Sequence, residues 1–206
     1  MRPAVFLDRD GVLNKLVWRD GWRVSPRALS EFEVLPEAAA CVEALRGAGL
    51  LLVVVTNQPD IARGFLAPAE LESMHARLQE LLPVDAIYVC PHDDPDGCLC
   101  RKPKAGLLLR ASREMDIDLE ASYLVGDNWK DITAGCAAGC KTVFVQGEEG
   151  DRTGISADFV VSSVGRAAEL ILAAGVVAPP SKRQAPARTQ VREPRPKAKR
   201  TRRITP

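Results

Sequence analysis

Five short apolar runs, separated by stretches with helical spacing, restrict the fold of this 206-residue chain more than any other feature. The runs cover residues 4–7, 50–55, 85–90, 123–125 and 142–145. Between the second and third runs, apolar residues recur at steps of three and four, as in an amphipathic helix: Leu71, Met74, Leu78 and Leu82. Nearly continuous apolar strands that alternate with helices are typical of a parallel sheet covered on both faces. The chain is therefore predicted to be an α/β protein.

Polar and charged residues follow four of these predicted strands. The first strand runs into "DRDG", the second into "TNQ" and the fourth into "GDNWKD", while the third leads to "RKPK". Ligands bind at the carboxyl ends of the strands in open parallel α/β sheets. "DRDG" alone is better explained by a surface turn, but the complete set in this order predicts a catalytic site along that edge.

The segment "CPHDDPDGCLC", residues 90–100, precedes "RKPK" and brings together Cys90, His92, Cys98 and Cys100. Three thiolates and one imidazole form a common ligand set for structural zinc, and they leave no open position for water. The loop has too few apolar residues to fold by itself, so a bound metal must order it. The alternative, buried or adventitious cysteines, does not explain the polar residues between the ligands.

The motifs resemble those of the haloacid dehalogenase (HAD) phosphohydrolase superfamily over residues 4 to about 146. "DRDGVLN", "VVVTNQ", "RKPK" and "VGDNWKD" are similar to its four motifs. The resemblance implies a Rossmann-like three-layer HAD fold with a central parallel sheet, a minimal cap and a zinc-binding loop. Within the superfamily the chain is similar to the small zinc-loop phosphatases of heptose bisphosphates and of histidinol phosphate. "TNQPDIARG" is nearer to the heptose group, although Pro59 and Asp60 stand where that group usually has Ser-Gly.

The resemblance also implies the roles of individual residues. Asp8 would attack phosphorus and form an aspartyl phosphate, and Asp10 would act as general acid and base. Two carboxylates facing a phosphate require a hard cation, and Mg²⁺ would be held by Asp8, the main-chain carbonyl of Asp10, and Asp127. Thr56, Asn57 and Lys102 would bind phosphoryl oxygens, and Arg101 would contact the substrate.

Two assignments have alternatives at this stage. Asp131 either orients Asp127 or Lys102, or is an ordinary acid that favours the N-terminus of a helix. A bisphosphate substrate needs extra cationic contacts, and the candidates near the motifs are Arg19, Arg63, Arg101 and Lys104. Outside the motifs, Cys41, Cys136 and Cys140 are expected to be small core residues, and His75 is expected to be exposed.

The distribution of charge predicts a separate C-terminal tail. Residues 179–206 contain ten of the 28 Lys and Arg residues but one of the 27 acids, so their net charge is +9 and the remainder carries −8. This Pro- and Arg-rich segment has almost no large apolar side chains and is predicted to be disordered. We therefore expect a phosphatase domain over residues 1–177 and a tail over residues 178–206.

The tail keeps a function of a different class open. A basic segment suits binding to polyanions, and the chain could be a nucleic-acid-binding protein or a polynucleotide 3′-phosphatase. The acidic remainder, which lacks an aromatic and basic platform, argues against this interpretation. No run of about 18 apolar residues and no signal-peptide layout is present, so we expect a monomeric cytoplasmic enzyme that acts on a small phosphorylated metabolite.

Overall fold

The computed structural model describes residues 1–147 and 156–175. Its centre is a six-stranded parallel sheet with the strand order β5-β4-β1-β6-β7-β8. The strands are β1 (Ala4–Leu7), β4 (Leu51–Asn57), β5 (Ala86–Cys90), β6 (Tyr123–Gly126), β7 (Lys141–Val145) and β8 (Phe159–Val161). The predicted parallel sheet is confirmed, and five of its strands coincide with the five apolar runs. The short edge strand β8 was not predicted.

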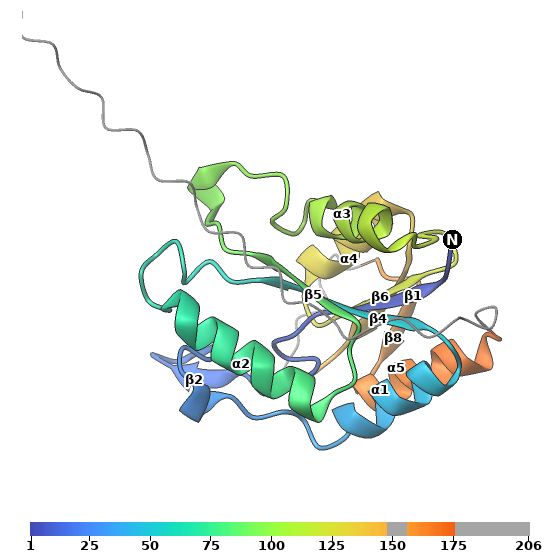
Figure 1. The fold of residues 1–206 in the computed structure, drawn as a ribbon, viewed down its shortest axis with the longest axis horizontal. Helices are drawn as coiled ribbons and strands as arrows, with labels where there is room; N and C mark the ends of the chain where they lie inside the picture. The colour runs from blue at the N-terminus through green and yellow to red at the C-terminus, as the bar shows by residue number, and fades with distance from the viewer. Residues whose placement is uncertain (148–155, 176–206) are drawn as a thin grey trace, which may run out of the picture.

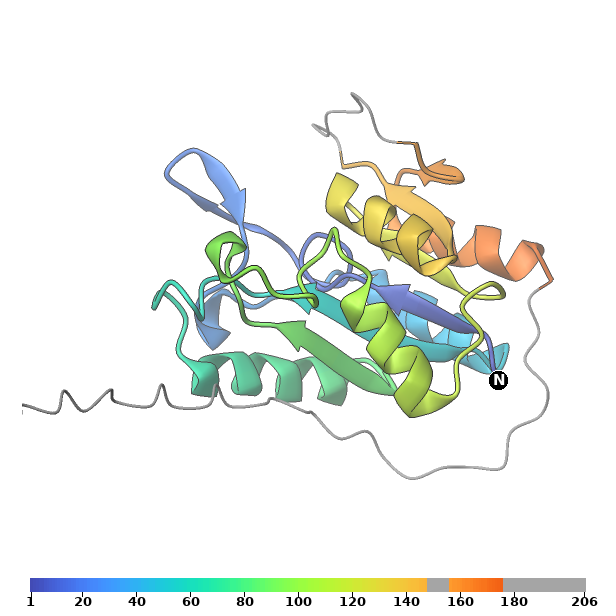
Figure 2. The ribbon, with the colours of Figure 1, turned by 90° about the horizontal axis from the view of Figure 1, so that it is seen from above.

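Helices cover both faces of this sheet and form three layers (Figure 1). One layer contains α1 (Ala38–Gly47), α2 (Pro68–Leu81) and α5 (Val164–Ala173), and the opposite layer contains α3 (Gly106–Met115) and α4 (Trp129–Ala138). The second view shows the same arrangement from above (Figure 2). This architecture is the Rossmann-like fold that the resemblance implied.

Strand β1 shows how the sheet divides the core into two clusters. Successive side chains of a strand point to opposite faces. Val5 and Leu7 accordingly pack into the cluster beneath α1 and α5, whereas Ala4 and Phe6 pack into the cluster beneath α3 and α4. All four are fully buried, because β1 lies in the interior of the sheet. The backbone that follows β1 is therefore held rigidly, and this segment carries Asp8 and Asp10.

A small hairpin was not predicted from the sequence. It consists of β2 (Val17–Arg19) and β3 (Trp22–Val24), which pair antiparallel and stand apart from the central sheet (Figure 2). Its residues Trp18 and Trp22 are 61% and 74% exposed. The one-turn 3-10 helices η1 (Leu29–Glu31) and η2 (Asp94–Asp96) are the other short elements, and η2 lies within the Cys/His loop.

Two expectations about single residues were wrong. His75 is fully buried on α2, where a charged partner discussed below holds its ring. Cys136 is exposed, whereas Cys41 and Cys140 are buried as expected. The predicted boundary at residue 177 and the tail lie outside the described residues. Within the described residues, no helix is both long enough and apolar enough to cross a membrane.

Candidate active site

The carboxyl edge of the sheet carries a cavity of about 330 Å³. Asp8 and Asp10 follow β1, Asn57 ends β4, and Asp127 follows β6. These residues, together with Arg101, Lys102 and Asp131, line the cavity. Thr56 is 1% exposed and lies next to the lining rather than in it. The parallel topology therefore brings residues from all four motifs to one place.

Two glycines allow this close approach. Gly11 has a φ of +85°, and a Cβ atom at this position would lie 2.0 Å from Oδ2 of Asp127. At Gly126, a Cβ atom would lie 2.2 Å from Cβ of Asp131. Any larger residue would push an aspartate away from the cavity, so both glycines are needed for the geometry of the acidic cluster.

Asp8, Asp127 and Asp131 form a cluster whose carboxylate oxygens lie within 4.8 Å of one another. Lys102 enters this cluster, with Nζ 2.9 Å from Oδ1 of Asp8 and 2.5 Å from Oδ1 of Asp131. Burial and the charge of Asp131 raise the pKa of Asp8 to about 7, although Lys102 acts in the opposite direction. Burial and the charge of Asp8 also raise the pKa of Asp127 well above its usual range.

These raised pKa values indicate a shortage of positive charge. Three carboxylates face one ammonium group, so the protein groups alone do not stabilise the fully ionised cluster. A hard divalent cation with oxygen ligands supplies the missing charge and favours ionised carboxylates. The donor set therefore fits Mg²⁺, with Asp8 and Asp127 as the carboxylates that were predicted to hold it.

Asp10 is held by a separate network of buried donors. Arg9 donates from Nε and Nη2 to Oδ1 of Asp10, at 3.1 and 2.9 Å, and from Nη2 to Oδ2 at 3.0 Å. Asn14 and Gln58 add amide donors at 2.9 and 2.7 Å. Burial alone would raise the pKa of Asp10, but the charge of Arg9 and these hydrogen bonds lower it below its usual value. Asp10 is therefore a carboxylate in a fixed orientation.

Lys102 is positioned by three other residues. Asn57 donates to the Lys102 carbonyl oxygen at 3.0 Å and accepts from the Lys102 main-chain N–H at 3.1 Å. The Nζ group also donates to the carbonyl of Val55 at 2.8 Å. Asp131 pairs with this ammonium group and also caps α4, where its Oδ2 accepts from the N–H of Asn128 at 3.2 Å. Asp131 therefore has both of the positions considered for it: it is a partner of Lys102 and an acid at the N-terminus of a helix.

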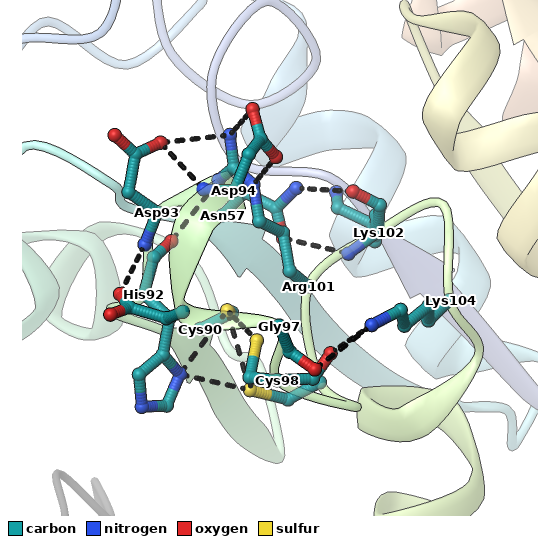
Figure 3. Close-up of polar contacts among 12 residues, drawn as sticks. Asn57, Cys90, His92, Asp93, Asp94, Gly97, Cys98, Arg101, Lys102 and Lys104 are labelled. Atoms are coloured by element: carbon teal, nitrogen blue, oxygen red, sulfur yellow. Dashed lines mark hydrogen bonds and ion pairs between the residues drawn. The ribbon is translucent and has the colours of Figure 1, made fainter.

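The side chains of Cys90, His92, Cys98 and Cys100 lie close together at the end of β5. Figure 3 shows three of them, Cys90, His92 and Cys98. Cys90 Sγ lies 3.7 Å from Cys98 Sγ and 3.3 Å from Cys100 Sγ, and His92 Nδ1 lies 3.3 Å from Cys100 Sγ. A tetrahedral zinc ion with Zn–S bonds of about 2.3 Å requires sulfur atoms separated by about 3.8 Å. The observed spacing approaches this value without a disulfide, so these side chains are able to hold one tetrahedral metal ion.

The Cys/His loop also fixes the basic segment that follows it. Arg101 is 8% exposed, and its Nε lies 2.5 Å from Oδ1 of Asp94. Lys104 donates from Nζ to the carbonyls of Gly97 and Cys98 (Figure 3). Arg101 lines the cavity, but its guanidinium already has a carboxylate partner within the protein.

Sequence reasoning missed four residues at the site: Arg9, Asn14, Gln58 and His75. Arg9, Asn14 and Gln58 lie inside or beside the motifs, and their types are those that donate hydrogen bonds to carboxylates. His75 lies on α2, and its Nε2 atom is 3.2 Å from Nη1 of Arg9. No signal in the linear sequence connects this histidine with Arg9, because only the packing of α2 brings the two together.

Comparisons with known proteins agree with this geometry. A family model described as HAD-hydrolase-like matches residues 99–167. A curated phosphatase of Pseudomonas aeruginosa is 40% identical over 157 residues, which cover 74% of this chain and 85% of the relative. The chain belongs to the HAD-like hydrolase family and is a phosphatase. The Pseudomonas relative is named D-glycero-β-D-manno-heptose-1,7-bisphosphate 7-phosphatase.

Two further relatives carry similar names. A Campylobacter jejuni protein named for the α form of the same bisphosphate is 36% identical over 154 residues, 71% of this chain and 83% of the relative. The solved D,D-heptose 1,7-bisphosphate phosphatase of B. bronchiseptica, complexed with magnesium and phosphate, has a TM-score of 0.74 and 33% identity. That comparison covers 84% of this chain and 99% of the solved chain.

Proposed function

We propose that this protein removes the 7-phosphate of D-glycero-D-manno-heptose 1,7-bisphosphate with Mg²⁺ as cofactor. The observation that carries the proposal is the buried cluster of Asp8, Asp127 and Asp131 around Lys102, at a cavity edge shared with Asp10. The relatives supply the substrate, because those named above are heptose bisphosphate phosphatases. Without the relatives, the cluster supports only a phosphate ester as substrate and a divalent cation as cofactor.

In the first step, a carboxylate oxygen of Asp8 attacks phosphorus and forms an aspartyl phosphate, while the bond from phosphorus to the sugar oxygen breaks. Asp10 gives its proton to the departing sugar oxygen. Asp10 is ionised in the free site, and the approach of the negatively charged phosphate favours its protonation. In the second step, Asp10 takes a proton from water, the water oxygen attacks phosphorus, and Asp8 is released.

Lys102 is proposed to bind phosphoryl oxygens, since its ammonium group lies against Asp8 and is held in place by Asp131. Thr56 and Asn57 are proposed to bind phosphoryl oxygens beside Lys102. Asn57 also positions Lys102 through two hydrogen bonds to its main chain. Mg²⁺, when bound by Asp8, Asp127 and the carbonyl of Asp10, would neutralise charge on the phosphoryl group. Arg101 is proposed to contact the sugar phosphate at the rim.

We further propose that Cys90, His92, Cys98 and Cys100 bind one structural zinc ion. The near-tetrahedral spacing of their donor atoms supports this assignment. The loop that these residues close carries Asp94, which binds Arg101, so the metal would order one wall of the cavity.

A panel of phosphate esters tests the proposed activity. Phosphate release should be measured with the heptose bisphosphate, histidinol phosphate and a DNA 3′-phosphate, each with and without Mg²⁺. The heptose bisphosphate should have the highest kcat/KM, and a chelator should abolish turnover. A higher kcat/KM for histidinol phosphate would refute the substrate and leave the phosphatase assignment intact. Release from DNA ends above release from the sugar would favour the polynucleotide alternative.

A further inference from the structure

A bisphosphate brings a second phosphate group, and the four cations considered from the sequence are already bound within the protein. Arg19 pairs with Glu31 at 2.7 Å, and Lys104 donates to two main-chain carbonyls. Arg63 and Arg101 line the cavity but bind aspartates of the Cys/His loop. Arg63 is the most fully occupied, because Nε and Nη2 each donate to Asp93 at 2.8 Å and Nη1 donates to Asp60 at 3.4 Å.

Arg27 also lines the cavity, and its contacts differ. Its Nε donates to Oδ2 of Asp60 at 2.6 Å, and its guanidinium carbon lies 4.5 Å from the centre of the Phe65 ring. Among the described residues, neither Nη1 nor Nη2 of Arg27 has a hydrogen-bond partner. The side chain is therefore held at one edge and one face, while its two terminal nitrogens remain available.

The loop after β4 builds the support for Arg27. Asp60 is 8% exposed, and its main-chain carbonyl accepts from the N–H groups of Phe65 and Leu66 at 2.8 and 3.0 Å. The loop thus closes on itself and brings the carboxylate of Asp60 and the ring of Phe65 to the same guanidinium. Holding a guanidinium in advance lowers the entropy that is lost when it binds an anion.

We propose that Arg27, held by Asp60 and Phe65, binds the phosphate group of the substrate that is not hydrolysed. The site would take a phosphate oxygen pair through Nη1 and Nη2, the bidentate geometry that guanidinium groups favour. It selects phosphate monoesters that carry a second anionic group over those that do not. This inference rests on the proposed function, and it adds residues that neither the sequence motifs nor the comparisons assign.

The experiment compares two substrates that share the same scissile phosphate: the heptose 1,7-bisphosphate and the heptose 7-phosphate. The measured quantity is the ratio of kcat/KM for the bisphosphate to kcat/KM for the monophosphate. Arg27→Gln should lower this ratio on the order of tenfold to hundredfold, the usual effect of losing hydrogen bonds to a charged group. Arg77→Gln is the matched control, because Arg77 carries the same charge but lies on α2 and pairs with Glu80.

Arg27 could instead serve only to join the segment after β3 to the loop after β4. Arg27→Lys separates the two roles, because lysine keeps the ion pair with Asp60 but not the bidentate edge. The ratio should therefore fall in Arg27→Lys as well, while its urea unfolding midpoint stays close to that of the parent. A lowered midpoint with an unchanged ratio in both Arg27 variants would overturn the proposal.

Other outcomes separate this inference from the proposed function. A wild-type ratio near one would refute the second-phosphate site while leaving the phosphatase intact. If the heptose esters are not hydrolysed, the same ratio is measured with fructose 1,6-bisphosphate and fructose 6-phosphate. If no ester is hydrolysed, the affinities of the parent and of Arg27→Gln for these two compounds are measured by calorimetry. Equal affinity of the two proteins for the bisphosphate would refute the second-phosphate site.

Discussion

Replacement of His75 tests the buried network behind Asp10. His75 is fully buried, and its Nε2 accepts a hydrogen bond from Arg9, which is itself fully buried and binds Asp10. In His75→Leu the Arg9 donor loses its acceptor without access to water. An unsatisfied buried donor costs about 1–3 kcal/mol, and more for a charged group. His75→Gln retains an acceptor oxygen, so at pH 7.5 it should lose less stability than His75→Leu.

The pH dependence of stability provides a sharper measurement. Burial and the charge of Arg9 lower the pKa of His75 to about 3 in the folded protein, whereas an unfolded histidine has a pKa of about 6.5. Between these values the unfolded chain binds a proton that the folded chain does not bind. The stability due to this pKa shift is thus fully present above pH 6.5. It decreases by about 1.4 kcal/mol per pH unit as the pH falls.

From pH 6.5 to pH 5, His75 should therefore account for a loss of about 2 kcal/mol in the free energy of unfolding. The assay is urea denaturation of the parent and of His75→Gln at pH 7.5 and at pH 5. Other titrating groups contribute equally to both proteins, so the difference between the two curves isolates His75. The variant should become relatively more stable at pH 5. Parallel losses in the two proteins would show that His75 is not held neutral, and the account of the Arg9 network would be wrong.

The remaining predictions concern the nucleophile, the metal and the tail. Asp8→Asn should keep the fold, as judged by circular dichroism, and abolish turnover, because an amide does not attack phosphorus; phosphate release within tenfold of the parent would exclude Asp8 as nucleophile. Metal analysis should find one zinc ion per chain, which Cys98→Ser should lose; zinc-free protein purified without chelators would contradict the assignment. Truncation after Val177 should leave kcat and zinc content unchanged and weaken salt-sensitive retention on heparin, whereas loss of activity with the fold intact would place the functional boundary further along the chain.

The sequence was sufficient to predict five of the six strands of the sheet and the edge that carries the site. Five strands of the sheet coincide with nearly continuous apolar runs, and short runs of this kind that alternate with amphipathic helices are typical of buried parallel strands. The hairpin of β2 and β3 was not predicted, because it lacks such an apolar pattern. Its strands contain three residues each and leave Trp18 and Trp22 exposed, so no alternation of apolar and polar residues marks them.

His75 illustrates why the buried network around Asp10 could not be predicted from the sequence. A histidine among polar residues on a helix suggests exposure, and α2 carries charged residues on both sides of it. Burial of His75 depends on Arg9, and Arg9 is buried because it pairs with Asp10, whose carboxylate also accepts hydrogen bonds from Asn14 and Gln58. A buried charge is stable only when its partners are all in place. Each of these polar side chains is stable in the interior only when its hydrogen-bond partners are buried there as well.

The same interdependence links the Cys/His loop to the far side of the cavity. Asp94 of this loop binds Arg101, and Asp93 binds Arg63, which also reaches Asp60 (Figure 3 shows the loop end of this chain of ion pairs). Asp60 in turn holds Arg27. Partly exposed ion pairs of this kind contribute little to stability individually, so their alignment depends on a backbone that is ordered by other means. A metal ion at the four Cys and His ligands would supply that order at one end, and the closed loop after β4 supplies it at the other. The polar residues between the four proposed zinc ligands therefore help to place the arginines that line the cavity.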